Sequence, residues 1–470
     1  MKFPYGICDF QKIIRDGYFY ADRTGLISLL EETGDQLLFL RPRRFGKSLL
    51  LSVLENYYDL VKADKFEQLF GQLHIGKNPT GKQNSYFILK WDFSEISPQG
   101  DSEAIQKNLH LYLNDSIRDF ALYYQDHIPT DIIRESSNGF STFKSLLAAV
   151  RQTSHPLYLL IDEYDNFANE VMMGAENGDR EQYKTLLSGE GALKALFKVI
   201  KSAAAGQGLD RVFITGVSPV VLSDITSGYN VAENIYLLPD FNHLCGFYQE
   251  EIAEMVQQVA ARCDLPETKA TEALELMRTF YNGYCFSPRA EKRIYNPTLV
   301  LYFLNAFQRD CEYPDKLLDS NMAMDRSKIN SIARLPGGQQ LVLDALAEQP
   351  AVSIPELADR FGVQDMLDAR KDHVFMASLL YYFGVLTIGG KGDFGKTALH
   401  IPNLVIRKLY AERIRDSLLP DNQSMETARQ ATEALYQLGD LRPLCDFVEQ
   451  KYFKIFHNRD LLAEGKTRDA

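Results

Sequence analysis

Residues 37–48 of the sequence, LLFLRPRRFGKS, decide the fold. An apolar run typical of a buried strand leads into a turn, and Gly46, Lys47 and Ser48 then open a segment with apolar residues at helical spacing. A helix start offers unpaired backbone N–H groups and the positive end of its dipole to an anion. The stretch therefore predicts a strand, a phosphate-binding loop and a helix, with Lys47 reaching phosphates and the Ser48 hydroxyl holding Mg²⁺.

The loop departs from the Walker A pattern G-x-x-x-x-G-K-[ST], because Arg41 stands where the first glycine is expected. A bare G-K-S also occurs by chance, and the flanking strand and helix are the context that supports phosphate binding. Arg43 and Arg44 add positive charge that a triphosphate would neutralise, and a solvated basic turn is the alternative. We predict that the nucleotide is bound by Arg43, Arg44, Phe45, Gly46, Lys47 and Ser48.

Residues 157–165, LYLLIDEYD, predict a second buried strand that delivers two carboxylates at its C-terminal end. In a phosphate-loop enzyme, Asp162 would hold Mg²⁺ together with Ser48. Glu163 would then act as the general base toward an attacking water. A strand that merely ends in two acidic residues is the alternative, and the phosphate loop upstream favours the catalytic interpretation.

Residues 211–220, RVFITGVSPV, predict a third buried strand. Thr215 and Ser218 in this segment are candidate sensors of the γ-phosphate. The alternative is that both hydroxyls only form hydrogen bonds with nearby backbone groups.

The order of strand and helix patterns predicts the fold class. Helical patterns alternate with strand patterns near residues 37–40, 86–94, 157–163, 211–217 and 234–238. This alternation is typical of an α/β fold, here a P-loop NTPase parallel sheet with helices on both faces. From about residue 246 helical patterns dominate, and LLYYFGVLTIGG followed by KTALHIPN predicts a helix end and a hairpin of winged-helix type. Such an element suggests DNA, but in nucleotide switches it also serves as a lid or a docking module.

Composition indicates an intracellular chain with a large core. It has 470 residues, of which 45% are hydrophobic, which is enough for two or three domains. The net charge of −12 does not favour wide nonspecific nucleic-acid binding. The six cysteines are dispersed without a C-x-x-C pair, so we expect reduced thiols, no zinc site and no disulfide framework. The N-terminus does not resemble a signal peptide and no apolar run is long enough to span a bilayer, which predicts a cytoplasmic protein.

Nine short blocks follow one another along nearly the whole chain: FYADRT at 19–24, RPRRFGKS at 41–48, LLIDEYDN at 159–166, ITGVSPV at 214–220, LCGFYQEE at 244–251, YNGYCF at 281–286, YNP at 295–297, SLLYYFGVLT at 378–387 and IPN at 401–403. Together they resemble the AAA-ATPase-like family, in which a P-loop domain is usually followed by a PD-(D/E)XK nuclease-like domain. The resemblance implies that the arginine-rich loop is this family's form of Walker A. It also implies that Tyr20 or Asp22 lines a base pocket, with simple packing onto the core as the alternative.

These observations combine into one functional prediction. We predict an ATP-binding, ATP-hydrolysing AAA-like switch that uses ATP and Mg²⁺ and signals to an unknown protein partner. The alternatives are a nucleotide-binding regulatory module with little turnover and the remnant of an ATPase-nuclease that acts on DNA. Nucleic acid is a less favoured partner, no membrane partner is expected, and an oligomer is left open. The predicted divisions are an ATPase domain at 1–245, a helical lid-like region at 246–335, a winged-helix-like region at 336–420 and a helical tail at 421–470.

The C-terminal residues predict a shortened member of the family. The tail resembles the start of the nuclease-like domain, and the sequence then stops. Glu464, Gly465 and Lys466 fit the E-x-K of the nuclease motif only superficially, because no apolar strand precedes them to hold metal ligands rigidly. We therefore expect no DNA cleavage by this chain, whether the gene is naturally short or interrupted.

Overall fold

A computed structural model describes residues 1–97, 102–129, 131–132, 135, 137–166, 192–219, 231–317, 328–330, 332–347, 352–358, 361, 372–419 and 421–451. The chain divides into two compact units, residues 1–409 and residues 410–470. Among the described residues, no helix is both long enough and apolar enough to cross a bilayer. Glu464 and Lys466 lie outside the described residues.

A five-stranded parallel sheet forms the centre of the first unit, with strand order β2-β3-β4-β1-β5. The strands are β1 (Gln36–Leu40), β2 (Phe87–Asp92), β3 (Leu157–Asp162), β4 (Leu209–Gly216) and β5 (Glu233–Asn234). The strands β1 to β4 lie where the sequence predicts them, whereas β5 shares only Asn234 with the strand predicted at 234–238. Because β4 lies between β1 and β3, the loop after β1 and the acidic end of β3 flank the end of β4.

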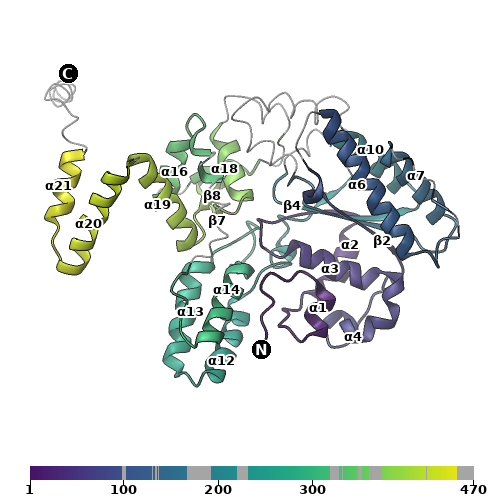
Figure 1. Ribbon diagram of the computed structural model, residues 1–470, viewed down its shortest axis with the longest axis horizontal. Coiled ribbons are helices and arrows are strands. Elements are labelled where there is room, and N and C mark those ends of the chain that lie inside the picture. The colour runs from purple at the N-terminus through teal and green to yellow at the C-terminus, as the bar shows by residue number, and fades with distance from the viewer. Residues whose placement is uncertain are drawn as a thin grey trace. The chain divides into compact units, whose positions relative to one another are not determined.

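Helices cover both faces of this sheet, as expected for a parallel sheet (Figure 1). One face carries α3 (Lys47–Tyr58), and the other carries α6 (Ser102–Tyr123), α7 (Gly139–Val150) and α10 (Ala192–Ala204). Short elements complete this part of the chain: α1 (Phe10–Arg15), η1 (Thr24–Leu26), α2 (Ile27–Thr33), η2 (Leu60–Lys65), α4 (Phe66–Phe70), α5 (His74–Lys77), η3 (Phe93–Glu95) and η4 (Pro239–Phe241). The predicted α/β class is therefore confirmed.

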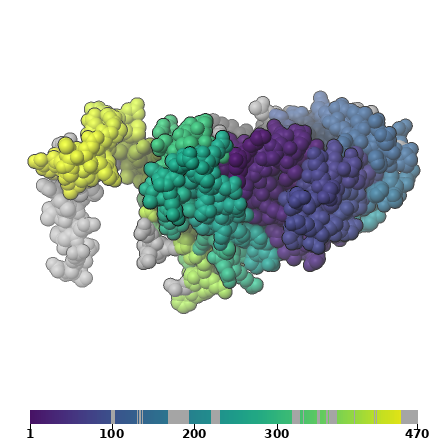
Figure 2. All heavy atoms as spheres, turned by 90° about the horizontal axis from the view of Figure 1, so that it is seen from below, coloured from purple at the N-terminus to yellow at the C-terminus, as the bar shows by residue number. Residues whose placement is uncertain are grey.

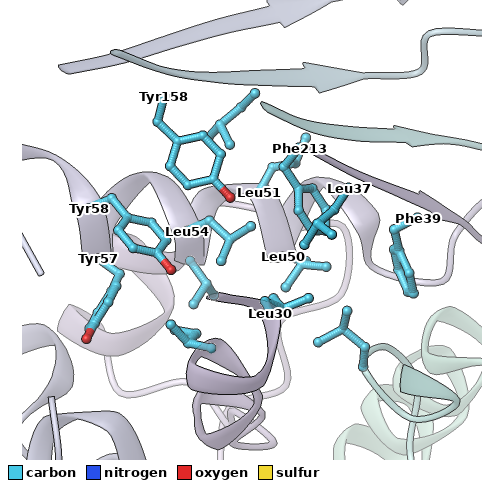
Figure 3. Packing of buried hydrophobic residues seen from close by; sticks show 14 of the residues in the cluster. Leu30, Leu37, Phe39, Leu50, Leu51, Leu54, Tyr57, Tyr58, Tyr158 and Phe213 are labelled. Atoms are coloured by element: carbon cyan, nitrogen blue, oxygen red, sulfur yellow. The ribbon is translucent and has the colours of Figure 1, made fainter. Parts of the chain in front are cut away.

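The core between α3 and the sheet fixes the position of the phosphate loop (Figure 3). Leu37 and Phe39 of β1 and Phe213 of β4 belong to the same buried cluster as Leu50 and Leu54 of α3. Strand residues two apart share a face, which explains why Leu37 and Phe39 both pack against this helix. Each buried side chain of this size contributes about 1.5–3 kcal/mol relative to exposure. The N-terminal end of α3 is thus held directly beyond the end of β1.

A helical region follows the sheet and lies beside the N-terminal residues in both views (Figures 1 and 2). It contains α12 (Gln249–Arg262), α13 (Glu267–Tyr281) and α14 (Pro297–Asp310). Cys263 and Cys311, which follow α12 and α14, form a disulfide with a Cα–Cα distance of 5.6 Å. The expectation that all thiols are reduced is wrong for this pair, because the packing of α12 against α14 brings together cysteines 48 residues apart.

The remaining elements include a small antiparallel sheet, with strand order β6-β8-β7. In chain order the elements are α16 (Gly338–Leu346), β6 (Val352–Ile354), α18 (His373–Tyr382), β7 (Thr387–Lys391), η6 (Asp393–Gly395), β8 (Thr397–His400) and α19 (Leu404–Leu418). The expected helix and hairpin are thus present. The second unit contains α20 (Asn422–Leu438) and α21 (Arg442–Lys451).

Candidate functional site

The predicted phosphate loop, residues 41–48, connects β1 to α3. Gly46 precedes the helix with a left-handed backbone, φ +93°, and Arg44 is also left-handed, at φ +66°. Within the described part of the chain, the backbone N–H groups of residues 45–48 have no hydrogen-bond acceptor. Unpaired N–H groups at a helix start favour negative charge, and the loop is therefore suited to phosphate.

Arg41, which replaces the first Walker A glycine, is a buried structural anchor. Its side chain is 1% exposed and donates to the carbonyl oxygens of Tyr236 (3.0 Å) and Phe241 (2.7 Å). The guanidinium also lies 4.1 Å from the centre of the Phe286 ring and 4.4 Å from that of Phe39. Burial lowers the pKa of Arg41 to about 10. Arg41 thus ties the loop to the segment after β5.

Lys47 and Ser48 begin α3 and have different partners. The Lys47 amine is buried and donates to the carbonyl oxygens of Arg41 (3.0 Å) and Pro42 (3.3 Å) in its own loop. The Ser48 hydroxyl donates to the Asp162 carboxylate at 2.6 Å. The structure therefore brings together the two residues that the sequence assigns to Mg²⁺.

The acidic pair lies at the end of β3, next to the phosphate loop. Asp162 is buried and accepts hydrogen bonds from Ser48, from the Thr215 hydroxyl (2.5 Å) and from the Glu163 N–H (3.0 Å). Glu163 follows the strand with a left-handed backbone, φ +48°, and lines the same pocket as Lys47. Burial raises the pKa of Glu163, and the positive charges of Lys47 and Arg43 oppose this shift only in part.

The two sensor candidates have separate hydrogen-bond partners. Thr215 contacts Asp162, whereas the Ser218 hydroxyl donates to Asp165 at 2.9 Å. Asp165 also accepts from the N–H groups of Val217 (3.0 Å) and Ser218 (2.8 Å). Thr215 thus belongs to the Asp162 cluster, while Ser218 helps to join the chain after β4 to the chain after β3.

A pocket of about 320 Å³ lies next to the phosphate loop. Its walls come from residues 44–53, from Glu163, from N-terminal residues 4–23, from residues 244–247 and from the start of α14. Tyr20 lines this pocket, whereas the Asp22 carboxylate accepts from the Thr24 hydroxyl (2.6 Å) and the His74 N–H (2.7 Å). Of Tyr20 and Asp22, which the resemblance places at a base pocket, only Tyr20 therefore lines the pocket next to the phosphate loop.

The FYADRT and LCGFYQEE blocks meet beside this pocket. Arg23 donates to both carboxylate oxygens of Glu251, at 2.6 and 2.7 Å, and to the carbonyl oxygen of Gly246. A bidentate arginine–carboxylate pair fixes the orientation of both side chains. This pair joins the N-terminal wall of the pocket to the start of α12, a link for which the sequence gives no local signal.

Residues far along the chain support the phosphate loop. The Phe45 ring packs edge-on against Tyr284 (4.9 Å between centroids) and Phe286 (5.2 Å), and Phe45 is buried. A Cβ atom added at Gly384, where φ is +78°, would lie 2.7 Å from Pro42. The loop is therefore packed against residues of the YNGYCF and SLLYYFGVLT blocks, which lie more than 200 residues away along the chain.

Comparisons with known proteins give one family and two distant likenesses. Residues 4–226 match the family model described as "Predicted AAA-ATPase". Over 453 residues the chain is 24% identical to the "Uncharacterized protein in vnfD 5'region" of Azotobacter chroococcum mcd 1, covering 93% of this chain and 74% of that protein. The structure of the Aeropyrum pernix ORC1 protein in complex with DNA is similar at a TM-score of 0.28 and 10% identity, with 86% of this chain and 96% of that chain covered. A TM-score this low does not establish a shared fold. The family match covers residues 4–226, which include the phosphate loop and the acidic pair.

Proposed function

We propose that this chain binds ATP with Mg²⁺ and hydrolyses it as a nucleotide-driven switch. The observation that carries the proposal is the 2.6 Å contact between Ser48 and Asp162, directly beside a loop with unpaired N–H groups. A hydroxyl and a carboxylate are oxygen ligands of the kind that Mg²⁺ prefers. The family match over residues 4–226 supports nucleotide binding on independent grounds.

In this proposal the loop residues bind the phosphates. The N–H groups of Phe45, Gly46, Lys47 and Ser48 would donate to phosphate oxygens. Lys47 would exchange two neutral carbonyl partners for phosphate oxygens, which form stronger charge-assisted hydrogen bonds. Arg44 lines the pocket and would add further positive charge.

The proposed metal ligands are Ser48 and Asp162. When bound, Mg²⁺ would neutralise charge that develops on the phosphate oxygens. The hydrogen bond from Thr215 and the buried position at the end of β3 fix the Asp162 carboxylate for this role. Thr215 would therefore orient the Asp162 carboxylate as a metal ligand. We also propose that Thr215 and Ser218 sense the γ-phosphate.

Glu163 is the proposed general base. Its carboxylate would accept a proton as a water oxygen bonds to the γ-phosphorus atom, while the bond from this phosphorus to the bridging oxygen breaks and ADP leaves. Burial raises its pKa, and a more basic carboxylate accepts this proton more readily. Glu163 also lies close enough to Lys47 and Arg43 for their charges to affect its titration.

The second candidate function is a nucleotide-binding module with little turnover. It is favoured by the hydrogen bonds from Lys47 to its own loop, because these bonds occupy two of the three donors of the amine. In that case nucleotide would mainly change the loop and its supports, and a protein partner would read the change. Turnover measurements separate the two functions.

We propose that the β6–β8 region is a winged-helix module used for packing or docking. The order α16, β6, α18, β7, β8 and the antiparallel pairing support this assignment. Helix α18, which precedes the hairpin, is buried throughout residues 375–382, so its side chains are not accessible to a DNA groove. A protein partner or a second copy of the chain therefore fits this proposal better than nucleic acid.

The test is calorimetric titration of the purified full chain with ATP, with and without Mg²⁺. Lys47→Ala should weaken ATP binding by about 1.5–3 kcal/mol, the range for hydrogen bonds to charged groups. This corresponds to roughly tenfold or more in Kd. Lys77→Ala, at an exposed lysine outside the pocket, is the matched control and should bind as the wild type does. Equal affinity of Lys47→Ala and wild type would exclude the phosphate loop as the binding site.

Phosphate release then tests hydrolysis. Glu163→Gln should retain ATP binding while turnover falls by about 10² or more, the usual contribution of a general base. Binding without turnover in the wild type would support the binding module instead.

A further inference from the structure

The hydroxyl of Thr298 contacts the phosphate loop from the helical region. Thr298 is the second residue of α14, and its hydroxyl donates to the carbonyl oxygen of Arg44 at 2.9 Å. The two residues are 254 positions apart in the chain, and both line the pocket. This hydrogen bond joins α14 directly to the phosphate loop.

This contact controls the direction of a neighbouring N–H group. In a trans peptide the carbonyl and the following N–H point in opposite directions. The Arg44 carbonyl and the Phe45 N–H belong to the same peptide group, so a hydroxyl bound to one fixes the direction of the other. If this peptide rotated, a carbonyl oxygen could face the bound phosphate in place of a donor. The left-handed backbone of Arg44, φ +66°, is uncommon for a residue with a side chain and therefore needs such support.

The start of α14 holds the Thr298 hydroxyl in a fixed place. The Asn296 side chain caps the helix by accepting from the N–H groups of Thr298 (3.0 Å) and Leu299 (3.2 Å). Pro297 occupies the first helical position, where its fixed φ suits the helix. Leu299 and Val300 are fully buried. The hydroxyl is thus carried by a rigid element that also forms part of the pocket wall.

We propose that Thr298 is a positioning residue that holds the phosphate loop in its anion-binding form and couples the loop to the helical region 249–310. This inference rests on the proposed nucleotide binding. Coupling between two sites is reciprocal, so a phosphate bound to the loop also stabilises the position of α14. Nucleotide occupancy is thereby transmitted to α14 through this hydrogen bond, which acts beside the packing of Phe45 on Tyr284 and Phe286.

The test compares ATP affinity in three variants of the full chain. Thr298→Val keeps the branched shape and removes the hydroxyl, whereas Thr298→Ser keeps the hydroxyl. Loss of one hydrogen bond predicts an ATP affinity about three- to tenfold lower for Thr298→Val. Thr298→Ser should restore affinity to within about twofold of wild type. Thr271→Val is the control, because this threonine donates to the Glu267 carbonyl on the exposed surface of α13.

A second ligand shows whether Thr298 acts by positioning the phosphate loop or only by contacting the bound molecule as part of the pocket wall. Adenosine, measured by competition with a fluorescent ATP analogue, has no phosphate and should bind all variants equally. Equal weakening of ATP and adenosine, an unchanged ATP affinity in Thr298→Val, or failure of Thr298→Ser to restore binding would each overturn the inference. If Thr298→Val does not fold, as judged from the fluorescence of the buried Trp91, Thr298→Ala takes its place with the same expected difference between ligands.

Lys47→Ala distinguishes failure of this inference from failure of the proposed function. A wild type that does not bind ATP removes both. A wild type that binds ATP, with a weaker Lys47→Ala and an unaffected Thr298→Val, removes only the role of Thr298.

Discussion

Arg41→Gly restores the Walker A glycine, and we expect it to destabilise the protein. The variant loses hydrogen bonds to the carbonyl oxygens of Tyr236 and Phe241, both at 3.0 Å or less. Hydrogen bonds from a charged group contribute about 1.5–3 kcal/mol each, or about 3–6 kcal/mol for two. Removal of a buried charge offsets part of this loss, while glycine adds about 0.5–1 kcal/mol of backbone entropy. We expect the free energy of unfolding to fall by about 3 kcal/mol or more.

The assay is urea denaturation followed by tryptophan fluorescence. Trp91 is the only tryptophan of the chain and is fully buried in β2, so its signal reports on the sheet that carries the loop. Arg151→Gly is the control, because this exposed arginine donates to the Gln207 carbonyl at the surface. It should change stability by less than about 1 kcal/mol, as most exposed positions do.

ATP affinity gives a second measurement of the same variant. If Arg41 anchors the loop, Arg41→Gly should bind ATP more weakly than wild type, although its sequence fits the motif better. Wild-type stability together with tighter ATP binding would refute the assignment of Arg41 as an anchor.

Three further predictions follow from the site and its surroundings. Asp162→Asn should bind ATP as the wild type does in EDTA but lose the gain in affinity that Mg²⁺ provides, and an intact Mg²⁺ effect in calorimetry would exclude Asp162 as a ligand. Because burial raises the pKa of Glu163, the folded protein binds this proton more tightly than the unfolded chain, and the ionised carboxylate lowers stability at neutral pH. Glu163→Gln should therefore melt at a higher temperature than wild type at pH 7, and the difference should shrink as the pH falls toward the ordinary glutamate value of 4.5; a constant difference from pH 4 to 8 would contradict this. Replacing Cys263 and Cys311 by serine should lower the free energy of unfolding by up to about 4 kcal/mol, the loop-closure estimate for cysteines 48 residues apart, whereas equal melting of oxidised and reduced wild type would exclude a stabilising disulfide.

Several features of the fold could be predicted from the sequence because their signals are local. Apolar runs predict the parallel strands, and helical spacing after Ser48 predicts α3. The order of strand, loop and helix also places Lys47 and Ser48 at the start of α3. The two carboxylates at the end of β3 follow from the same kind of pattern, because carboxyl ends of parallel strands share one edge of the sheet.

Other features depend on contacts that no local pattern encodes. In the sequence, Arg41 stands where the Walker A pattern has a glycine. Its role as an anchor is visible only in the fold, where its side chain donates to the Tyr236 and Phe241 carbonyls. The partner of Ser218 is likewise decided by the fold, which places the Asp165 carboxylate 2.9 Å from the Ser218 hydroxyl. The expectation of reduced thiols is wrong for Cys263 and Cys311, because dispersed cysteines carry no spacing signal for a disulfide.

The sequence by itself determined the parallel sheet, the phosphate loop and the two acidic residues, because periodicity and motif order act over a few neighbouring residues. Only the tertiary structure decided how that loop is held. Phe45 packs against Tyr284, and Thr298 binds the carbonyl of Arg44, across more than 200 residues of chain. Such contacts form when separate elements pack around one core, so their pairing is fixed by the packing and not by the spacing of the residues.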